Sequence, residues 1–426
     1  MNILVISAML PYPVDNGGAN RLYNLYTRIA KKHTLTWVCP VWKGQEGNVW
    51  GVEAFSDRVV QLPRSDERPL PERGWGGLLK KVVAHLHWER LFVYCFGYVD
   101  APGLYWLPAT PERMETVERV LSEKPYDLVG TEFEGNAELV QAVKDIPCVL
   151  ATHNVASSIF KRIRSTHPGD WEDRLFAGLE LQKIIRYEQQ NYAAYQGAVA
   201  VSEEDRRVLQ ERCPGLPVEI IPNGVDIEYY RPSKTPVDAH SMVYIGNYSY
   251  PPNADAMLYF CREIFPLIRA RVADARMILL GANPPAELAG MPGVELPGFV
   301  EDIRPIVQSA GMLVVPLRLG GGTRLKILDG MALGKAIVAT GVGAEGLDVR
   351  PGEDLLIADQ PDAFAAAVLR LMEDAELRER LGRNGRKVVE RDYDWNVLAD
   401  RAADWYERVA KAGRSAKTSE AGLAAR

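Results

Sequence analysis

The stretch Gly320-Gly-Gly-Thr-Arg-Leu-Lys-Ile-Leu-Asp-Gly-Met-Ala-Leu-Gly-Lys-Ala-Ile-Val-Ala-Thr340 says most about the fold of this chain. It reads as a glycine-rich turn, a short helix and a buried strand in immediate succession. The glycines leave backbone N–H groups unobstructed, and the helix that follows presents its positive dipole end to an anion. Arg324 and Lys326 add positive charge beside the turn. The stretch predicts a diphosphate site, and a plain surface turn before an amphipathic helix is the alternative.

Short apolar, β-branched runs alternate with helical stretches along the whole chain. In the first half they are Ile3–Ile6, Leu35–Cys39, Val59–Leu62, Leu128–Val129, Cys148–Thr152 and Ala198–Val201. In the second half they are Val218–Ile221, Met242–Ile245, Met277–Leu280, Met312–Pro316, Ala336–Ala339 and Leu355–Ile357. Strands that alternate with helices predict parallel sheets, so the two series predict two doubly wound α/β domains.

Turn-forming residues cluster between Pro214 and Pro232, where we place the seam between the domains. The prediction is an N-terminal Rossmann-like domain over 1–213 and a C-terminal one over 214–393. An amphipathic helix over 394–412 is expected to pack back towards the first domain, with a disordered tail over 413–426. Ligands of such sheets bind beyond the carboxyl ends of the strands, so a central cleft between two facing sheets is the expected site.

Composition excludes several classes of protein. Fifty Lys plus Arg against 56 Asp plus Glu give a mildly acidic balance, which does not favour nucleic acid as a partner. The five cysteines are scattered and odd in number, unlike a disulfide framework, and they favour a reducing cytoplasm. The first residues lack the basic region of a signal peptide, and no uncharged apolar run approaches membrane-spanning length.

One segment leaves two interpretations open. Between Trp75 and Tyr98 apolar and aromatic residues are interleaved with Lys80, Lys81 and Arg90. The segment is either an insertion helix packed on the first domain or a surface that contacts a membrane. The second interpretation would put the protein peripherally on the inner face of the membrane.

Several strings, in order, resemble the GT-B glycosyltransferases, and more narrowly the retaining family 4 group that builds bacterial polysaccharides and glycolipids. They are Pro11-Tyr-Pro-Val-Asp-Asn-Gly-Gly18, Ile221-Pro-Asn-Gly-Val-Asp226, Tyr244–Asp255, Leu280-Gly281, Gly298-Phe-Val-Glu-Asp302 and Gly320–Ala339. The resemblance covers nearly the whole chain. It implies two Rossmann-like domains that face a central cleft, and transfer of a sugar from a nucleotide donor with retention of configuration.

The chain departs from the family pattern at two places. The family commonly carries two acidic residues eight positions apart in the nucleotide turn, but here the first falls on Gly321 and the second is Asp329 instead of Glu. The usual Arg and Lys are missing from the turn that begins at Gly246. The resemblance then implies that the cationic contacts move to Arg324 and Lys326.

The donor half of the expected site follows from these strings. A departing diphosphate gathers negative charge, which backbone donors and cations stabilise. The residues expected to bind the nucleotide sugar are Gly17, Gly18, Asn247, Phe299, Val300, Gly321, Gly322, Thr323, Arg324 and Asp329, and Arg324 and Lys326 are also expected to be catalytic. The resemblance implies that Asp329 accepts hydrogen bonds from the ribose hydroxyls and that the Gly298–Asp302 stretch lies near the base. An ordinary carboxylate on the helix face is the alternative for Asp329.

Polar residues after the strands of the first domain are the candidates for contact with the transferred sugar and the acceptor. His153 follows a buried strand and is the candidate for a catalytic contact with the transferred sugar, donating a hydrogen bond to a hydroxyl. A structural histidine is the alternative. The candidate acceptor-binding residues are Asn16, Arg21, Glu132, Glu134 and Asn154. Glu132 and Glu134 are equally consistent with solvated loop charges, and Arg21 with a helix-surface role.

These expectations define an enzyme with no cofactor and no metal, because the glycine-rich turn and its cations are expected to stabilise the leaving diphosphate without one. UDP or GDP is the expected nucleotide, and a glycan or lipid-linked molecule the expected acceptor. The alternatives are a non-catalytic subunit that binds a nucleotide sugar and, less favoured, a sugar-nucleotide epimerase. A nicotinamide enzyme is disfavoured because no G-x-G-x-x-G follows the first strand. The sequence leaves the oligomeric state open.

Overall fold

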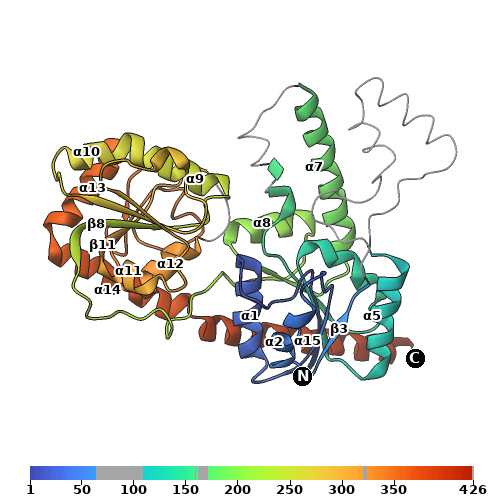
Figure 1. Ribbon diagram of the computed structural model, residues 1–426. Helices are drawn as coiled ribbons and strands as arrows, with labels where there is room; N and C mark the ends of the chain where they lie inside the picture. Colours follow the sequence, from blue (N-terminus) through green and yellow to red (C-terminus); the bar gives the residue numbers. More distant parts are fainter. Residues whose placement is uncertain (64–108, 159, 162–170, 320–323, 425–426) are drawn as a thin grey trace. The chain divides into compact units, whose positions relative to one another are not determined.

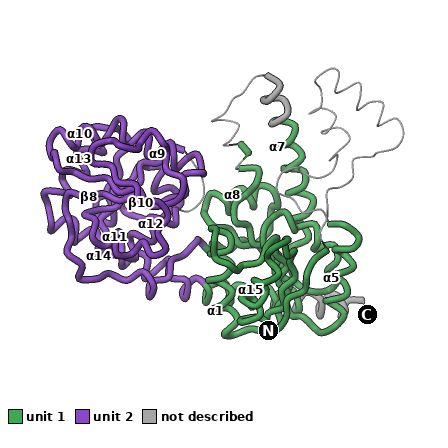
Figure 2. The backbone as a smooth tube through the Cα atoms, in the orientation of Figure 1, with its two compact units in different colours: residues 1–221, 399–426 green, residues 222–398 purple. Residues whose placement is uncertain are grey.

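The computed structural model describes residues 1–63, 109–158, 160–161, 171–319 and 324–424. The chain divides into two compact units, shown in Figure 2. Unit 1 comprises Met1–Ile221 and Ala399–Arg426, and unit 2 comprises Pro222–Leu398. The boundary after Ile221 falls inside the predicted seam, eight residues beyond the predicted end of the first domain at 213. The segment 75–98 lies outside the described residues.

Unit 1 contains a seven-stranded sheet in the order β3-β2-β1-β4-β5-β6-β7, and each neighbouring pair is parallel. The strands are β1 (Asn2–Ile6), β2 (Thr34–Cys39), β3 (Arg58–Gln61), β4 (Leu128–Glu132), β5 (Cys148–Ala151), β6 (Gly197–Ala200) and β7 (Val218–Ile220). Strand order reverses after β3, as the chain returns from that edge to place β4 beside β1. This reversal is the topological switch point at which doubly wound sheets bind ligands.

The helices of unit 1 connect these strands. Among the described residues they are α1 (Gly17–Ile29), η1 (Glu46–Asn48), α2 (Trp50–Glu53), α5 (Pro111–Glu123), η3 (Glu134–Ala142), α7 (Trp171–Tyr192) and α8 (Glu203–Arg212). Asn16 starts α1, because its side-chain oxygen accepts the N–H of Ala19 at 3.0 Å. The buried face of α1 carries Leu22, Leu25, Tyr26 and Ile29 at helical spacing.

Unit 2 contains a six-stranded parallel sheet in the order β10-β9-β8-β11-β12-β13. The strands are β8 (Asp238–Ile245), β9 (Arg276–Leu280), β10 (Val294–Gly298), β11 (Ala310–Val315), β12 (Ile337–Ala339) and β13 (Leu356–Ile357). The sequence did not predict β10, an edge strand of only partial burial that contains Glu295 and Pro297. Such residues are typical of edges, where a missing donor or a charge costs little.

Helices cover both faces of the second sheet. In Figure 1, α9, α10 and α13 lie on one side of the strands, and α11, α12 and α14 lie on the other. Their bounds, with the intervening turns, are α9 (Pro251–Tyr259), η4 (Phe260–Ile264), α10 (Phe265–Arg269), η5 (Ala286–Leu288), α11 (Arg304–Ser309), α12 (Leu325–Ala332), α13 (Pro361–Glu373) and α14 (Ala375–Asp392). The prediction of two doubly wound α/β domains is confirmed.

The last helix, α15 (Trp395–Ala424), begins in unit 2 and continues into unit 1. Its residues Ala402, Tyr406, Val409 and Ala410 are buried, which matches the predicted amphipathic stripe. The structure continues this helix through most of 413–426, where the sequence had predicted a disordered tail. The tail is rich in alanine, with lysine, arginine and glutamate, all good helix formers that extend a helix already nucleated by packing.

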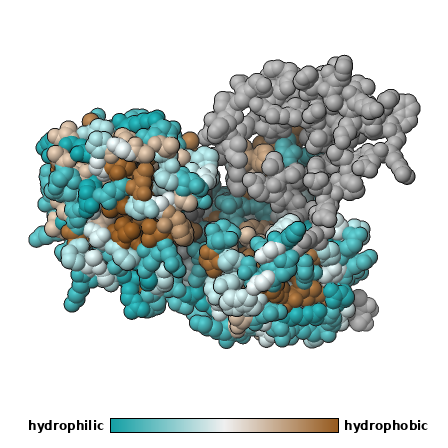
Figure 3. Space-filling model, in the orientation of Figure 1, coloured by the Kyte–Doolittle hydropathy of each residue, from teal (hydrophilic) through white to brown (hydrophobic). Residues whose placement is uncertain are grey.

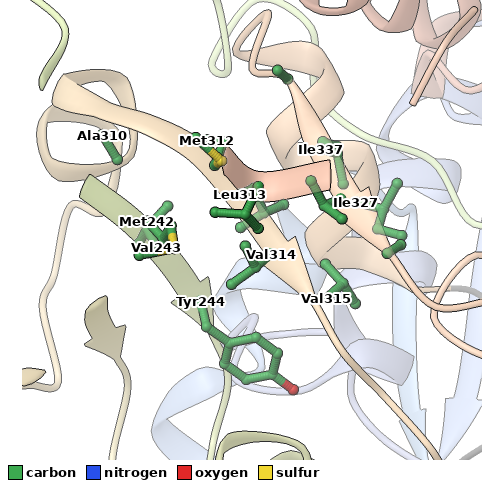
Figure 4. Packing of buried hydrophobic residues seen from close by; sticks show 14 of the residues in the cluster. Met242, Val243, Tyr244, Ala310, Met312, Leu313, Val314, Val315, Ile327 and Ile337 are labelled. Carbon is green, nitrogen blue, oxygen red and sulfur yellow. The ribbon is translucent and has the colours of Figure 1, made fainter. Parts of the chain in front are cut away.

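Each sheet has an aliphatic core. Figure 4 shows the core of unit 2, where Val243, Leu313, Val314 and Ile337 from neighbouring strands pack together and against Ile327 of α12. On the face shown in Figure 3, hydrophilic residues cover most of the surface and apolar residues gather in patches. No helix among the described residues combines the length and the apolar character needed to cross a membrane.

Candidate active site

A buried carboxylate organises the polar residues of unit 1 at the carboxyl end of β4. Glu132, the last residue of that strand, is 1% exposed. Its Oε1 accepts from the Tyr26 hydroxyl at 2.5 Å, and its Oε2 lies 2.9 Å from Nε2 of His153. The Tyr26 hydroxyl also lies 3.1 Å from the hydroxyl of Tyr406 on α15. These four side chains form one continuous network.

His153 follows β5 and is held from two directions. Glu132 meets one edge of its ring, and the Phe133 ring stacks on its face, with centroids 3.8 Å apart and an interplanar angle of 21°. The His153 side chain is 11% exposed. Burial is the main influence that lowers its pKa, and nearby Arg21 acts in the same direction, whereas the pairing with Glu132 opposes them. The imidazole is therefore neutral at neutral pH.

The glycines after β1 are close to this network. A Cβ built on Gly18 would lie 3.1 Å from Cζ of Phe133, the ring that stacks on His153. Gly18 thus gives the backbone a close approach to Phe133, and Gly17 begins α1 beside it. The structure therefore brings Gly17, Gly18, Glu132 and His153 together at the carboxyl ends of β1, β4 and β5.

The other predicted residues of unit 1 have local partners. Arg21 is 2% exposed, and its guanidinium donates to the carbonyl of Ile221 at 2.7 Å. Asn16 caps α1, whereas Asn154 is exposed. Glu134 is 7% exposed and accepts the N–H of Ala156 at 2.9 Å, so it holds the chain that follows His153. Burial raises the pKa of Glu134, and the nearby Glu188 adds to the rise.

In unit 2 the predicted cations gather at the start of α12. The Lys326 ammonium donates to the Tyr244 hydroxyl at 2.6 Å and to Oδ1 of Asn253 at 2.8 Å. Tyr244 lies near the carboxyl end of β8, and Figure 4 shows its hydroxyl directed away from the aliphatic core. Burial lowers the pKa of Lys326 well below its usual value, and the neighbouring Arg324 adds to this effect.

Arg324 and Asp329 complete this group. Arg324 immediately precedes α12 and is 7% exposed; its guanidinium donates to the carbonyl of Val342 at 3.4 Å. Burial raises the pKa of the Asp329 carboxyl to about 7, although the charge of Lys326 lowers it. Lys326 therefore interacts electrostatically with Arg324, which precedes this short helix, and with Asp329 within it.

The turn after β8 contacts the same lysine through Asn253. The exposed Asn247 accepts the Asn253 side-chain amide on its backbone carbonyl at 2.8 Å. Gly281, with φ of 131°, follows β9, and a Cβ there would lie 1.8 Å from the carbonyl oxygen of Gly246. Only glycine permits these two turns to approach so closely.

The remaining donor-side predictions fall into two groups. Phe299 follows β10 with 78% of its surface exposed, while Val300 packs partly against the core. Gly321, Gly322 and Thr323 lie outside the described residues. No group of three or more His, Cys, Asp or Glu side chains arranged to hold a metal occurs within the part of the chain that the structure describes.

Sequence analysis missed five aromatic or amide partners of these sites. They are Tyr26, Phe133, Tyr406, Tyr244 and Asn253. Tyr26 and Tyr406 occur in apolar helical stripes, where a tyrosine is normally counted as core. A buried tyrosine hydroxyl needs a hydrogen-bond partner, which was the available signal.

Comparison with solved structures identifies the class of fold. The fold resembles that of sucrose-phosphate synthase from Thermosynechococcus elongatus, with a TM-score of 0.65 at 15% identity over 97% of this chain and 100% of that one. It also resembles Anabaena HepE, solved in complex with UDP, with a TM-score of 0.62 at 13% identity over 96% of this chain and 100% of that one. The two doubly wound units define the GT-B class of glycosyltransferase folds.

The sequence identifies the family within that class. Residues 15–229 match Glycosyltransferase Family 4, and residues 239–374 match the family described as glycosyl transferases group 1. This chain therefore belongs to glycosyltransferase family 4.

Two curated relatives are informative. Phosphatidyl-myo-inositol mannosyltransferase of Mycobacterium tuberculosis is 30% identical over 234 residues, which cover 51% of this chain and 61% of the relative. The match thus spans less than two thirds of that protein. Alpha-maltose-1-phosphate synthase of the same organism is 25% identical over 403 residues, covering 83% of this chain and 99% of the relative.

Proposed function

We propose that this chain is a retaining glycosyltransferase that moves a hexosyl group from a nucleoside diphosphate sugar to an acceptor hydroxyl, without a metal or a resident cofactor. The observation that carries the proposal is the pair of cations at the start of α12, the buried Arg324 and the half-buried Lys326. Arg324 and Lys326 follow the glycine-rich stretch in the sequence, and the hydrogen-bond partners of Lys326 are neutral. An anion that approaches this pair gains strong stabilisation in a poorly solvated setting.

The chemistry requires such a pair. As the anomeric carbon–oxygen bond of the donor breaks, negative charge grows on the leaving diphosphate, and Arg324 and Lys326 stabilise it. The acceptor oxygen forms the new bond on the same face, and its proton passes to an oxygen of the leaving phosphate. This front-face route needs no protein nucleophile. Asp329 then accepts hydrogen bonds from the ribose, once its carboxyl is ionised.

Unit 1 supplies the contact with the transferred sugar. The neutral imidazole of His153, held by Glu132 and Phe133, forms a hydrogen bond with a sugar hydroxyl. A rigidly held partner of this kind favours the transition state because it costs no reorganisation during the reaction. Gly17 and Gly18 let the substrate approach the backbone beside Phe133.

The comparisons support the choice of donor and acceptor. Anabaena HepE, which resembles this chain in fold, is solved with UDP and with UDP-glucose. A UDP sugar is therefore one donor to test, and a GDP sugar is the other. The mycobacterial mannosyltransferase is named for a phosphatidyl-myo-inositol substrate, which favours a lipid-linked acceptor here over a glycan or a small molecule. With such an acceptor, the enzyme works in the cytoplasm at the inner face of a membrane.

A thermal-shift screen tests the proposal. Purified full-length protein is mixed with UDP, GDP, ADP, dTDP or CMP and their common sugars, in EDTA, and donors that stabilise it are then assayed for sugar release. A ligand raises the midpoint as its concentration exceeds its dissociation constant, so one nucleoside diphosphate is expected to stand out. No shift with any nucleotide would overturn the donor site.

Two variants show whether the shift comes from the proposed site. Arg324→Ala should reduce the ligand-induced shift, measured against its own unliganded midpoint so that any loss of stability is subtracted. Arg383→Ala is the control, because Arg383 is exposed and pairs with Glu379 on α14. It should shift as the wild type does.

A non-catalytic nucleotide-sugar-binding subunit is the second candidate function. It is favoured by the replacement of the first family acid with Gly321 and of the second with Asp329. Such a subunit would be stabilised by a nucleotide sugar and would release no sugar with any acceptor extract. Sugar release that disappears in Lys326→Met would reject it.

A further inference from the structure

The donor and the acceptor can be assigned for each hydrogen bond around Glu132. This assignment fixes which ring nitrogen of His153 carries hydrogen. Glu132 is buried, and its carboxylate has acceptors only. The guanidinium of Arg21 lies close enough to interact electrostatically with Glu132. The Tyr26 hydroxyl therefore donates to Oε1, and Nε2 of His153 donates to Oε2.

The same reasoning assigns the last bond. Because the single hydrogen of the Tyr26 hydroxyl is used on Glu132, the hydroxyl of Tyr406 must donate to Tyr26 across the 3.1 Å that separates them. Tyr406 is 1% exposed and lies on α15, 380 residues along the chain from Tyr26. A chain of hydrogen bonds therefore runs from Tyr406 on the C-terminal helix, through Tyr26 and Glu132, to His153.

We propose that Glu132, held by Tyr26 and Tyr406, is a positioning residue that keeps His153 in the tautomer with hydrogen on Nε2, so that Nδ1 accepts a hydrogen bond from a substrate hydroxyl. This rests on the proposed function and deepens it, because it replaces the expected donor role of His153 with an acceptor role. Among the described residues the imidazole of His153 hydrogen-bonds through Nε2 alone, so a substrate hydroxyl would meet the ring at Nδ1.

Independent contacts support the assignment. Phe133 fixes the plane of the imidazole by stacking at 3.8 Å, while Glu132 fixes its rotation in that plane. The charged or titratable groups around the ring are Arg21 and Tyr26 of α1, Glu132 of β4 and Tyr406 of α15. Burial lowers the pKa of His153, so Nδ1 is unprotonated at neutral pH and able to accept.

Nuclear magnetic resonance of the full chain tests the tautomer without any need for activity. Protein labelled with ¹⁵N-histidine is recorded from pH 5 to pH 9, and the His153 signals are assigned by their loss in His153→Gln. The wild type is expected to show one tautomer with hydrogen on Nε2. Glu132→Gln is expected to mix or reverse the tautomers. Hydrogen on Nδ1 in the wild type would overturn the proposal.

Tyr406→Phe is the milder variant, in case Glu132→Gln does not fold. It removes one hydroxyl and should shift the His153 signals and lower kcat by about 3- to 10-fold, the effect of one weakened hydrogen bond, with the KM for the donor unchanged. UDP-glucose and GDP-mannose are the donors used. Tyr195→Phe is the matched control, because its buried hydroxyl bonds the Ala137 carbonyl outside the network. Unchanged signals in Tyr406→Phe, or equal changes in Tyr195→Phe, would contradict the proposal.

The outcomes separate this inference from the proposed function. Sugar transfer by a wild type whose His153 carries hydrogen on Nδ1 overturns the positioning role alone. A second outcome is a protein that shows the expected tautomer and binds nucleotides but releases no sugar from either donor. It would overturn both the positioning role and the proposed glycosyltransferase function, since the network would then position nothing for a reaction.

Discussion

The polar groups of the two units are stabilised in opposite ways. In unit 1 each oxygen of the Glu132 carboxylate already has a donor, from Tyr26 and from His153. In unit 2 the Lys326 ammonium has neutral partners, and burial and Arg324 lower its pKa. The carboxylate of the first site has a donor for each oxygen, whereas the ammonium of the second has no anion among its hydrogen-bond partners.

The difference matches the two tasks in the proposed reaction. A sugar ring is recognised by hydrogen bonds whose geometry must be fixed in advance. A leaving diphosphate is recognised by charge, and charges that are poorly compensated in the free protein interact most strongly with it. The comparison therefore predicts that activity depends on the positions of the side chains in unit 1 and on the positive charge in unit 2.

The largest expected effect comes from removing a charge in unit 2. Lys326→Met keeps a long side chain and should lower kcat/KM by about 100- to 1000-fold, the usual cost of losing one group that stabilises developing negative charge. Lys335→Met is the matched control: this lysine of unit 2 is buried, and its ammonium bonds the Gln308 carbonyl. If Lys326→Met turned over the donor as fast as the control does, the proposed role of charge in unit 2 would be wrong.

The next effect concerns the imidazole of unit 1. His153→Gln should lower kcat by about 10- to 100-fold with little change in the KM for the donor. Because burial lowers the pKa of His153 below its usual value of about 6.5, the wild-type kcat should hold as pH falls to 6.5 and decline only below it. This decline should vanish in His153→Gln and persist in His240→Gln, whose side chain lies exposed in unit 2.

A smaller effect tests geometry alone. In Gly18→Ala the new methyl group would lie 3.1 Å from Phe133, so the ring that stacks on His153 must move by a few tenths of an ångström. We expect kcat to fall about 3- to 10-fold while thermal stability is kept, since alanine favours the helix. Gly47→Ala places its methyl group in open space and should behave as the wild type.

The smallest effect is on stability in unit 2. The Asp329 carboxyl titrates at about 7 in the folded chain and near 4 when unfolded, so the folded state holds an extra proton between these values. Its contribution to stability therefore falls as pH rises from about 4 to 7. Calorimetry should show Asp329→Asn gaining roughly 2–4 °C in Tm over the wild type between pH 5 and pH 8. Parallel pH profiles would contradict the raised pKa.

Much of the fold could be predicted from the sequence, because buried parallel strands are short continuous apolar runs. Each run predicted as a strand, from Ile3–Ile6 to Leu355–Ile357, corresponds to a strand in the structure, with ends that differ by a few residues. The edge strand β10 was missed because Glu295 and Pro297 interrupt its apolar pattern. An edge strand needs less burial and so leaves a weaker signal.

The sites were predictable only in part. Position after a strand was enough to single out Glu132 and His153, since the carboxyl ends of parallel strands share one edge. The hydrogen bond between Tyr26 and Tyr406 joins residues 380 positions apart, and no local pattern encodes it. Likewise, nothing next to Lys326 in the sequence indicates that its ammonium reaches Tyr244 and Asn253, because that contact depends on how α12 packs against β8 and α9.

The most direct test of the account is donor turnover by the purified full chain in EDTA. Release of nucleoside diphosphate from UDP-glucose and from GDP-mannose is followed with a membrane lipid extract as acceptor, for the wild type, Lys326→Met and Lys335→Met. The account predicts turnover of one donor by the wild type and Lys335→Met, and a loss of about 100-fold or more in Lys326→Met. Binding of the nucleotide with no turnover by any of the three proteins would contradict it.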